Sequence, residues 1–166
     1  MIVVDSNVLA YLYLPGEYTA VAEALLEHDP NWAAPVLWRS EFRNILAGYL
    51  RRGSLTFQQA HSLQCEAEDL LAGAEYEVDS LGVLELVRDS ECSAYDCEFV
   101  ALAMKLGTKL VTMDGKLLRA FPDIARSHSL LRCAGNPLPT WCRWRATLDA
   151  GLEKAANKAG VKRFRE

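Results

Sequence analysis

Short apolar runs alternate with longer helical patterns over the first 128 residues. Brief runs at residues 2–4, 31–35, 76–78 and 109–112 are typical of strands in a parallel sheet that is covered on both faces. The segments between them repeat apolar residues at intervals of three and four, which predicts helices with one buried face. The expected helices cover residues 6–14, 18–27, 37–52, 56–71, 80–87 and 93–107.

Strands that alternate with helices, without hairpin signals, predict an α/β fold with a parallel sheet and helices on both faces. Gly53 and Gly107 follow two of the helical segments and are expected to end them. Ligands in such folds bind beyond the carboxyl ends of the strands. Polar residues directly after a strand are therefore candidates for a functional site.

The pattern changes after residue 128. An irregular spacer at residues 136–139 precedes a stripe at helical spacing, formed by Trp141, Trp144, Leu148, Leu152 and Ala155. We expect one domain over residues 1–128 and a C-terminal basic extension over residues 129–166, made of an amphipathic helix and a frayed tail. We expect the tryptophans to cover apolar surface. The Lys and Arg residues of this extension could either bind RNA through charge and stacking or form a solvated surface, and both interpretations stay open.

The composition describes one globular domain. Of 166 residues, 51% are apolar, which suffices for a full core. No segment approaches the roughly 18 uninterrupted apolar residues that a membrane helix needs. The N-terminus lacks a basic leader, so we expect a cytoplasmic protein. Its five cysteines, without a C-x-x-C pair, are expected to be reduced thiols that serve mainly in packing: Cys65, Cys92, Cys97, Cys133 and Cys142.

Charge is divided unevenly along the chain. Residues 1–128 carry 10 Lys and Arg against 19 Asp and Glu, whereas residues 129–166 carry 8 against 3, and the net charge is −4. An acidic body repels a polyanion. A nucleic-acid substrate would therefore have to be held through metal ions and local basic residues.

Four carboxylates stand at the ends of four separate apolar segments. Asp5 and Asp114 directly follow predicted strands, and Glu41 and Asp96 fall near the starts of predicted helices. Carboxylates that converge repel one another, and a hard divalent cation with oxygen ligands is the usual remedy. The four acids are therefore candidates for a metal site at the carboxyl edge of the sheet.

The motifs around these acids resemble those of the PIN-domain ribonucleases, in particular the VapC-like toxins of prokaryotic toxin–antitoxin pairs. Over about residues 1–128, the motifs are D-S-N-V-L from Asp5, E-F-R-N-I-L from Glu41, S-A-Y-D ending at Asp96, and L-V-T-M-D ending at Asp114. The resemblance implies a PIN-like three-layer α/β/α fold and Mg²⁺- or Mn²⁺-dependent hydrolysis of RNA to 5′-phosphate and 3′-hydroxyl ends. It implies that these four acids are the catalytic, metal-binding quartet. It also implies a small antitoxin as a partner and a homodimer.

Three of the acids have a purely structural alternative. Asp5 could be only the N-cap of the helix that follows it. Ser93-x-x-Asp96 resembles a capping box with Asp in place of Glu. Asp114-Gly115 is an ordinary turn dipeptide. For each of these acids a local role and a role in a metal site are both open.

Glu41 lies on the flank of an apolar stripe, and a partly buried glutamate needs a partner. That partner is either a cation bound by the site or a neighbouring arginine, Arg39 or Arg43. Glu98 lies about 200° around its helix from Asp96, so we expect it to point away from the site.

Four polar residues are expected to support the acids: Ser6, Asn7, Asn44 and Thr112. The hydroxyls of Ser6 and Thr112 are candidates to hydrogen-bond the carboxylates or a metal-bound water. Asn7 and Asn44 match positions in the PIN motifs, and we interpret both as orienting residues rather than ligands.

Three functions remain open from the sequence. The first is a toxin-type endoribonuclease neutralised by an antitoxin, and the second is a PIN nuclease of RNA maturation or turnover without an antitoxin. The third is a catalytically inactive module that binds RNA or protein, against which the intact quartet argues. The expected chemistry is metal-assisted attack of water on a phosphodiester, with Glu41 or Asp114 as the proton acceptor.

Overall fold

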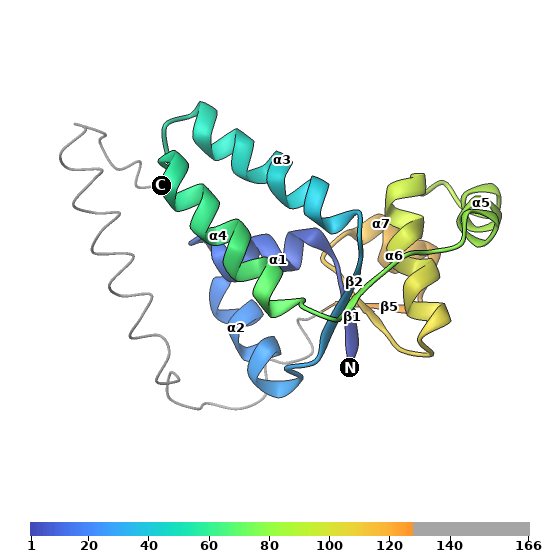
Figure 1. Ribbon diagram of the computed structural model, residues 1–166. Helices are drawn as coiled ribbons and strands as arrows, with labels where there is room; N and C mark the ends of the chain where they lie inside the picture. The colour runs from blue at the N-terminus through green and yellow to red at the C-terminus, as the bar shows by residue number, and fades with distance from the viewer. Residues whose placement is uncertain (128–166) are drawn as a thin grey trace. The chain divides into compact units, whose positions relative to one another are not determined.

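The structure is a computed structural model that describes residues 1–127, in which strands alternate with helices (Figure 1). The elements are β1 Ile2–Val4, α1 Ser6–Tyr13, α2 Thr19–His28, β2 Trp32–Pro35, α3 Trp38–Arg51, α4 Phe57–Leu70, β3 Glu75–Tyr76, α5 Ser80–Arg88, α6 Ala94–Lys105, β4 Leu110–Val111, α7 Gly115–Ala120 and β5 Ala125–Arg126. The expected domain boundary at residue 128 and the predicted C-terminal helix, with its tryptophan stripe, lie outside the described residues.

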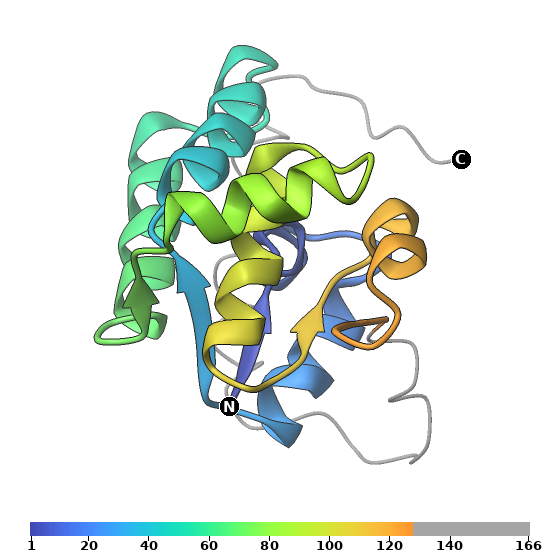
Figure 2. The same cartoon turned by 90° about the vertical axis from the view of Figure 1, so that its right-hand side faces the viewer.

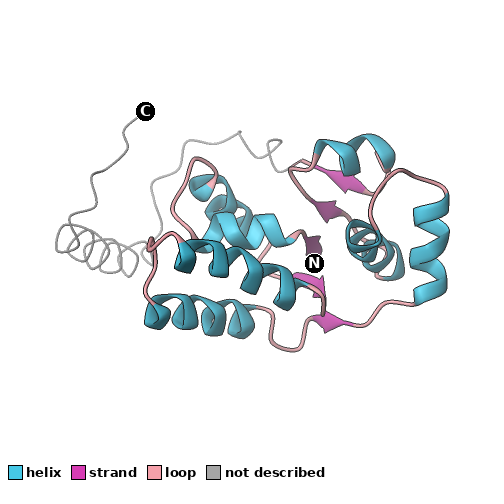
Figure 3. Ribbon diagram, turned by 90° about the horizontal axis from the view of Figure 1, so that it is seen from above, coloured by secondary structure: helices cyan, strands magenta, loops and turns pink. Residues whose placement is uncertain are grey.

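The strands form one five-stranded parallel sheet in the order β3-β2-β1-β4-β5. Helices α1 to α4 lie on one side of the sheet and α5 and α6 on the other (Figures 1 and 2). The view from above shows the same three layers (Figure 3). The predicted α/β/α fold with a short parallel sheet is therefore confirmed.

The core lies on both faces of the central strands. Every residue of β1 is buried, as expected for a strand covered from two sides. Helix α6 packs on β1, β2 and β4 and buries Phe99, Val100 and Leu102. On α3, Trp38 and Phe42 are fully buried. Burial of one such side chain stabilises the fold by about 2–3 kcal/mol.

Helix ends follow the local rules of the sequence. Thr56 caps α4 in a capping box with Gln59, whose side chain accepts from the Thr56 amide at 2.8 Å. Gly53 and Gly107 follow α3 and α6 with φ of 68° and 62°, a conformation that favours glycine. The expectation that these two glycines end their helices is confirmed.

The C-terminal part of the sheet differs from expectation. Neither α7 nor β5 is predicted by the sequence, because a six-residue helix and a two-residue strand are too short to show a period. Strand β3 begins one residue earlier and ends two residues earlier than expected, and β4 is one residue shorter at each end.

Residues 1–127 contain three free cysteines and no helix that could span a membrane. Cys65, Cys92 and Cys97 are free thiols, the last two buried, while Cys133 and Cys142 lie outside the described residues. None of the helices within residues 1–127 has the length and apolar character to cross a membrane.

Replacing Thr56 by alanine should lower the free energy of unfolding by about 1 kcal/mol, because the first turn of α4 loses its side-chain cap. Thr56 is exposed, so little packing is lost with it. Urea denaturation measures the change. Gln58→Ala, an exposed change in the same turn, is the control, and equal unfolding midpoints for the two variants would contradict the capping role.

Candidate functional site

The candidate residues belong to separate segments near the carboxyl edge of the sheet. Asp5 follows β1 and is the N-cap of α1, while Asp114 follows β4 and is the N-cap of α7. Glu41 lies in the first turn of α3 and Asp96 in the first turn of α6. Parallel neighbouring strands end at the same edge, so Asp5 and Asp114 both follow strands at this edge of the sheet.

Asp5 is held from two directions. Its residue is only 7% exposed, and the Thr112 hydroxyl donates to Oδ2 at 2.6 Å. Its other oxygen, Oδ1, accepts from the backbone N–H of Asn7 at 3.1 Å and from the Asn7 side chain at 3.4 Å. The carboxylate is therefore fixed both to β4 and to its own helix.

Thr112 connects two of the acids. Its buried hydroxyl donates to Asp5 and also accepts from the backbone N–H of Asp114 at 3.0 Å. One hydroxyl can do both, since it carries one proton and two lone pairs. This places the turn after β4 in a fixed relation to Asp5.

Glu41 is held by α1 rather than by an arginine. Ser6 donates to Oε2 of Glu41 at 2.7 Å. Arg39 pairs instead with Glu75 and Glu68. The alternative that Glu41 is an ion-pair partner of Arg39 is therefore wrong.

Arg43, the other candidate partner of Glu41, also forms its hydrogen bonds with other residues. Arg43 donates through Nε to the backbone oxygen of Arg39 at 2.8 Å and through a terminal nitrogen to Ser40 at 3.3 Å.

Asn44, one turn beyond Glu41 on α3, is exposed. Its orienting role stays a prediction.

The capping alternatives for the three aspartates are present in the structure. Asp96 accepts from the Ser93 amide at 3.1 Å and from the Ser93 hydroxyl at 2.7 Å, in a capping box. Asp114 accepts from the amide of Lys116 at 2.7 Å. A carboxylate has about four lone-pair sites, so a cap leaves capacity for another ligand. Capping and ligand roles are therefore compatible in one side chain.

Burial and neighbouring negative charges raise the pKa values of two of the four acids, Asp5 and Glu41. Burial raises the pKa of Asp5, and the charge of Asp96 raises it further against the lowering effect of its hydrogen bonds. The pKa of Glu41 is raised by burial first, and then by the charges of Asp5, Asp96 and Glu98. These three charges are all negative. Asp5, Glu41 and Asp96 therefore repel one another electrostatically.

Glu98 is the residue that the sequence reasoning missed. We expected it to point away from the site, yet its charge raises the pKa of Glu41. A 200° separation from Asp96 on α6 does not set the distance to a residue of another helix, and Glu41 lies on α3. Burial also raises the pKa of Glu98 itself.

The donor chemistry of the site fits a small divalent cation. In residues 1–127, no three His, Cys, Asp or Glu side chains lie close enough to enclose a metal ion. Mg²⁺ rarely needs such a cage, because it usually keeps several waters and takes one or two carboxylates from the protein. Carboxylate oxygens that repel one another match this preference.

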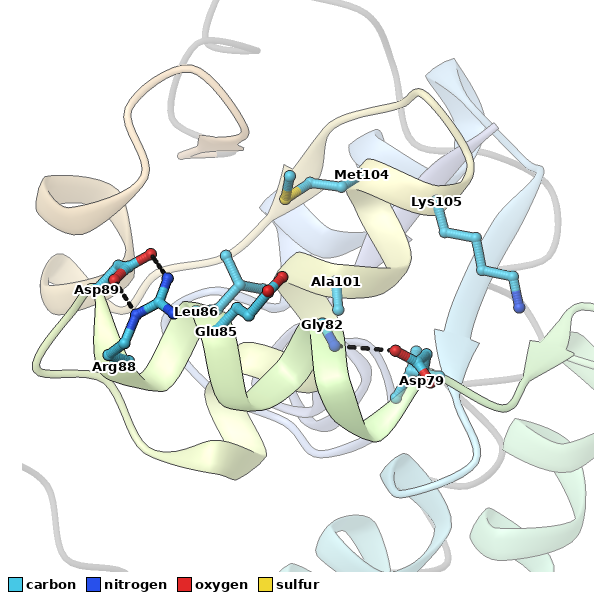
Figure 4. Close-up of a pocket in the computed structure, with 10 residues that line it drawn as sticks. Asp79, Gly82, Glu85, Leu86, Arg88, Asp89, Ala101, Met104 and Lys105 are labelled. Atoms are coloured by element: carbon cyan, nitrogen blue, oxygen red, sulfur yellow. Dashed lines mark hydrogen bonds and ion pairs between the residues drawn. The ribbon is translucent and has the colours of Figure 1, made fainter.

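The pocket between α5 and α6 is a separate feature (Figure 4). It has a volume of about 470 Å³, and its lining includes Asp79, Glu85, Met104 and Lys105. None of the four candidate acids lines it. The candidate metal site therefore lies outside this pocket.

Replacing Glu41 by glutamine should stabilise the metal-free protein at neutral pH. The raised pKa means that ionised Glu41 costs folding free energy above that pKa, and the cost disappears at pH values below the ordinary range of a glutamate. Glutamine still accepts from Ser6 but carries no charge. Thermal unfolding in EDTA from pH 4 to pH 8 should show an advantage that grows with pH.

Glu77→Gln is the matched control, because Glu77 is exposed. This control should show little change at any pH. A Glu41→Gln protein that is less stable than the wild type at pH 7 in EDTA would contradict the electrostatic account.

The chain is similar to known proteins in both sequence and structure. Residues 2–122 match the family model described as PIN domain. Over 130 residues, the chain is 30% identical to Ribonuclease VapC3 of Pyrobaculum aerophilum, a match that covers 74% of this chain and 96% of that protein.

Three solved structures are also similar. The structure of FitAB bound to an IR36 DNA fragment has a TM-score of 0.60 at 18% identity and covers 82% of this chain and 100% of that one. FitAcB from Neisseria gonorrhoeae gives 0.57 at 20%, with coverage of 75% and 95%. PAE2754 from Pyrobaculum aerophilum gives 0.62 at 23%, with coverage of 78% and 85%. At these identities the structures support the fold alone.

The resemblance found from four short motifs is thus confirmed by a match along most of the chain and by the arrangement of the sheet. The protein belongs to the PIN-domain family.

Proposed function

We propose that this protein is a divalent-metal-dependent endoribonuclease that acts as the toxin of a toxin–antitoxin pair. The observation that carries the proposal is the electrostatic repulsion among Asp5, Glu41 and Asp96 at the carboxyl edge of a PIN fold. Such repulsion costs stability unless a cation offsets it. The ribonuclease name of the relative from Pyrobaculum aerophilum supports the choice of RNA as substrate.

The acidic quartet, Asp5, Glu41, Asp96 and Asp114, would hold one or two Mg²⁺ or Mn²⁺ ions. A bound ion would offset charge on the scissile phosphate and promote ionisation of the attacking water. Ser6 and Thr112 keep Glu41 and Asp5 in place through hydrogen bonds of 2.7 and 2.6 Å. Asn7 and Asn44 complete the proposed set as orienting residues.

Hydrolysis would form a bond between a water oxygen and phosphorus and break the bond between phosphorus and the 3′ oxygen. The 3′ oxygen gains a proton, which leaves a 3′-hydroxyl and a 5′-phosphate. The water must lose a proton, and Glu41, whose pKa is raised by burial, is the proposed acceptor. Its second oxygen, Oε1, accepts no hydrogen bond from residues 1–127 and is available for this role.

The proposed partners follow from the resemblance to VapC-like toxins. A small antitoxin would occupy the acidic cleft and an adjacent apolar groove, and the toxin would form a homodimer. An RNA substrate and the free thiols of Cys65, Cys92 and Cys97 favour the cytoplasm as the compartment.

Asp5→Asn and Asp96→Asn should each abolish RNA cleavage, with a loss of at least about 10²-fold, while the fold stays intact. Each asparagine keeps one oxygen that accepts the capping hydrogen bond but cannot supply a negative oxygen. At position 5, the NH2 group also replaces the oxygen that accepts from Thr112, so the folding check is needed most for this variant. Cleavage of a generic RNA in Mg²⁺ or Mn²⁺ is the assay, with circular dichroism to check folding and Glu77→Gln as the active control. Equal activity of the wild type in excess EDTA would rule out the metal mechanism, and cleavage with Mn²⁺ would rule out an inactive module.

Expression in a bacterial host should arrest growth if the protein is a toxin, and co-expression of its antitoxin should restore growth. The Asp5→Asn variant should not arrest growth, because arrest depends on cleavage. An active nuclease that leaves growth unaffected would instead favour a PIN enzyme of RNA maturation or turnover.

A further inference from the structure

Arg39 joins three elements beside the start of α3. Its Nε donates to one oxygen of Glu75 at 2.6 Å and a terminal nitrogen donates to the other at 2.7 Å. Its second terminal nitrogen pairs with Glu68 at 2.7 Å. Glu75 belongs to β3 and Glu68 to α4, so one guanidinium fastens α3 to both.

Trp38 completes this arrangement, which we name the Arg39 clamp (Trp38, Arg39, Glu68 and Glu75). The buried Trp38 donates through its ring N–H to Glu75 at 2.6 Å. The Arg39 side chain is 32% exposed and that of Glu75 19%, so the pair is partly shielded from solvent. Arg39 accordingly holds the pKa of Glu75 below its usual range.

The clamp stands where α3 leaves the sheet. Only Val36 and Leu37 separate β2 from α3, and the Val36 amide donates to Tyr76 of β3 at 3.0 Å. Leu37, the N-cap position, supplies no side-chain cap to α3. The side chain of Glu75 therefore fixes the first turn of α3 against the edge of the sheet through the side chains of Trp38 and Arg39.

Glu41 is carried by the same turn. It lies two residues after Arg39, which is about 3 Å along the helix and about 200° around it. Arg39 contacts β3 and α4 on one side of α3, and Glu41 accepts from Ser6 of α1 on the other. The first turn of α3 is thus held from both sides, and Glu41 lies on this turn.

We propose that Arg39 is a positioning residue for Glu41, acting through the clamp that sets the first turn of α3. This inference rests on the proposed nuclease function. It assigns to Arg39 no contact with RNA or metal. An arginine is required because its planar fork serves both oxygens of Glu75 and still reaches Glu68, which a lysine ammonium cannot do in the same geometry.

The test compares Arg39→Gln, Arg39→Lys and Val83→Ala. Val83 is a buried residue of α5, so its truncation lowers stability without touching the clamp. Each purified protein is measured for melting temperature, for Mn²⁺ binding by calorimetry without RNA, and for kcat and KM on one RNA. Amide hydrogen exchange at Glu41 and Phe42 reports the order of the first turn of α3.

Arg39→Gln should weaken Mn²⁺ binding or lower kcat by up to about 10–100-fold, the effect of losing a direct outer partner of a ligand, which is an upper bound here because Arg39 acts through the turn that carries Glu41. KM should change by less than about threefold, because Arg39 does not touch the substrate. Exchange at Glu41 should accelerate. Arg39→Lys should recover part of the loss, and Val83→Ala should lower the melting temperature while keeping Mn²⁺ affinity and kcat.

Two results would overturn the inference alone. One is an active wild type with Arg39→Gln unchanged in Mn²⁺ affinity, kcat and exchange, which would make the clamp merely structural. The other is a rise in KM alone, which would make Arg39 an RNA contact. A wild type that neither binds Mn²⁺ nor cleaves RNA would overturn the proposed function and this inference with it.

Discussion

The hydrogen bond from Thr112 to Asp5 ties the ends of the two central strands together, and the acidic site depends on it. A carboxylate that is only 7% exposed is costly without donors, and this 2.6 Å contact supplies one from the neighbouring strand. The same hydroxyl accepts from the amide of Asp114, so the contact also sets where α7 begins. Without it, the buried acid would have only its own helix to satisfy it.

The site concentrates negative charge at a cost to the metal-free protein. Asp5 and Glu41 both have raised pKa values because burial and neighbouring carboxylates oppose ionisation. The fold tolerates this because each acid also has a structural partner: Thr112 and Asn7 for Asp5, and Ser6 for Glu41. In the proposed function, this unfavourable charge is what makes the site ready to bind a cation, so the electrostatic cost and the activity have the same origin.

Some contacts of the acidic residues could be predicted from the sequence, and others could not. The capping box of Ser93 and Asp96 could be read from spacing alone, and the structure contains it, because a cap involves residues three apart. The choice between an arginine and another partner for Glu41 could not be made, since Arg39 is close in sequence but is drawn to Glu75, 36 positions away. The influence of Glu98 on Glu41 was missed for the same reason, because it acts between two helices.

The sequence by itself determined the order of strands and helices from β1 to β4, the starts and ends of the main helices to within one or two residues, and which acids follow strands, because periodicity, caps and glycine turns act over a few residues. Only the tertiary structure decided which of those acids influence one another and what holds each in place. It brought Ser6 to Glu41 and Thr112 to Asp5 across 35 and 107 positions of sequence. Such distances depend on how helices pack on the sheet, and no local pattern encodes them.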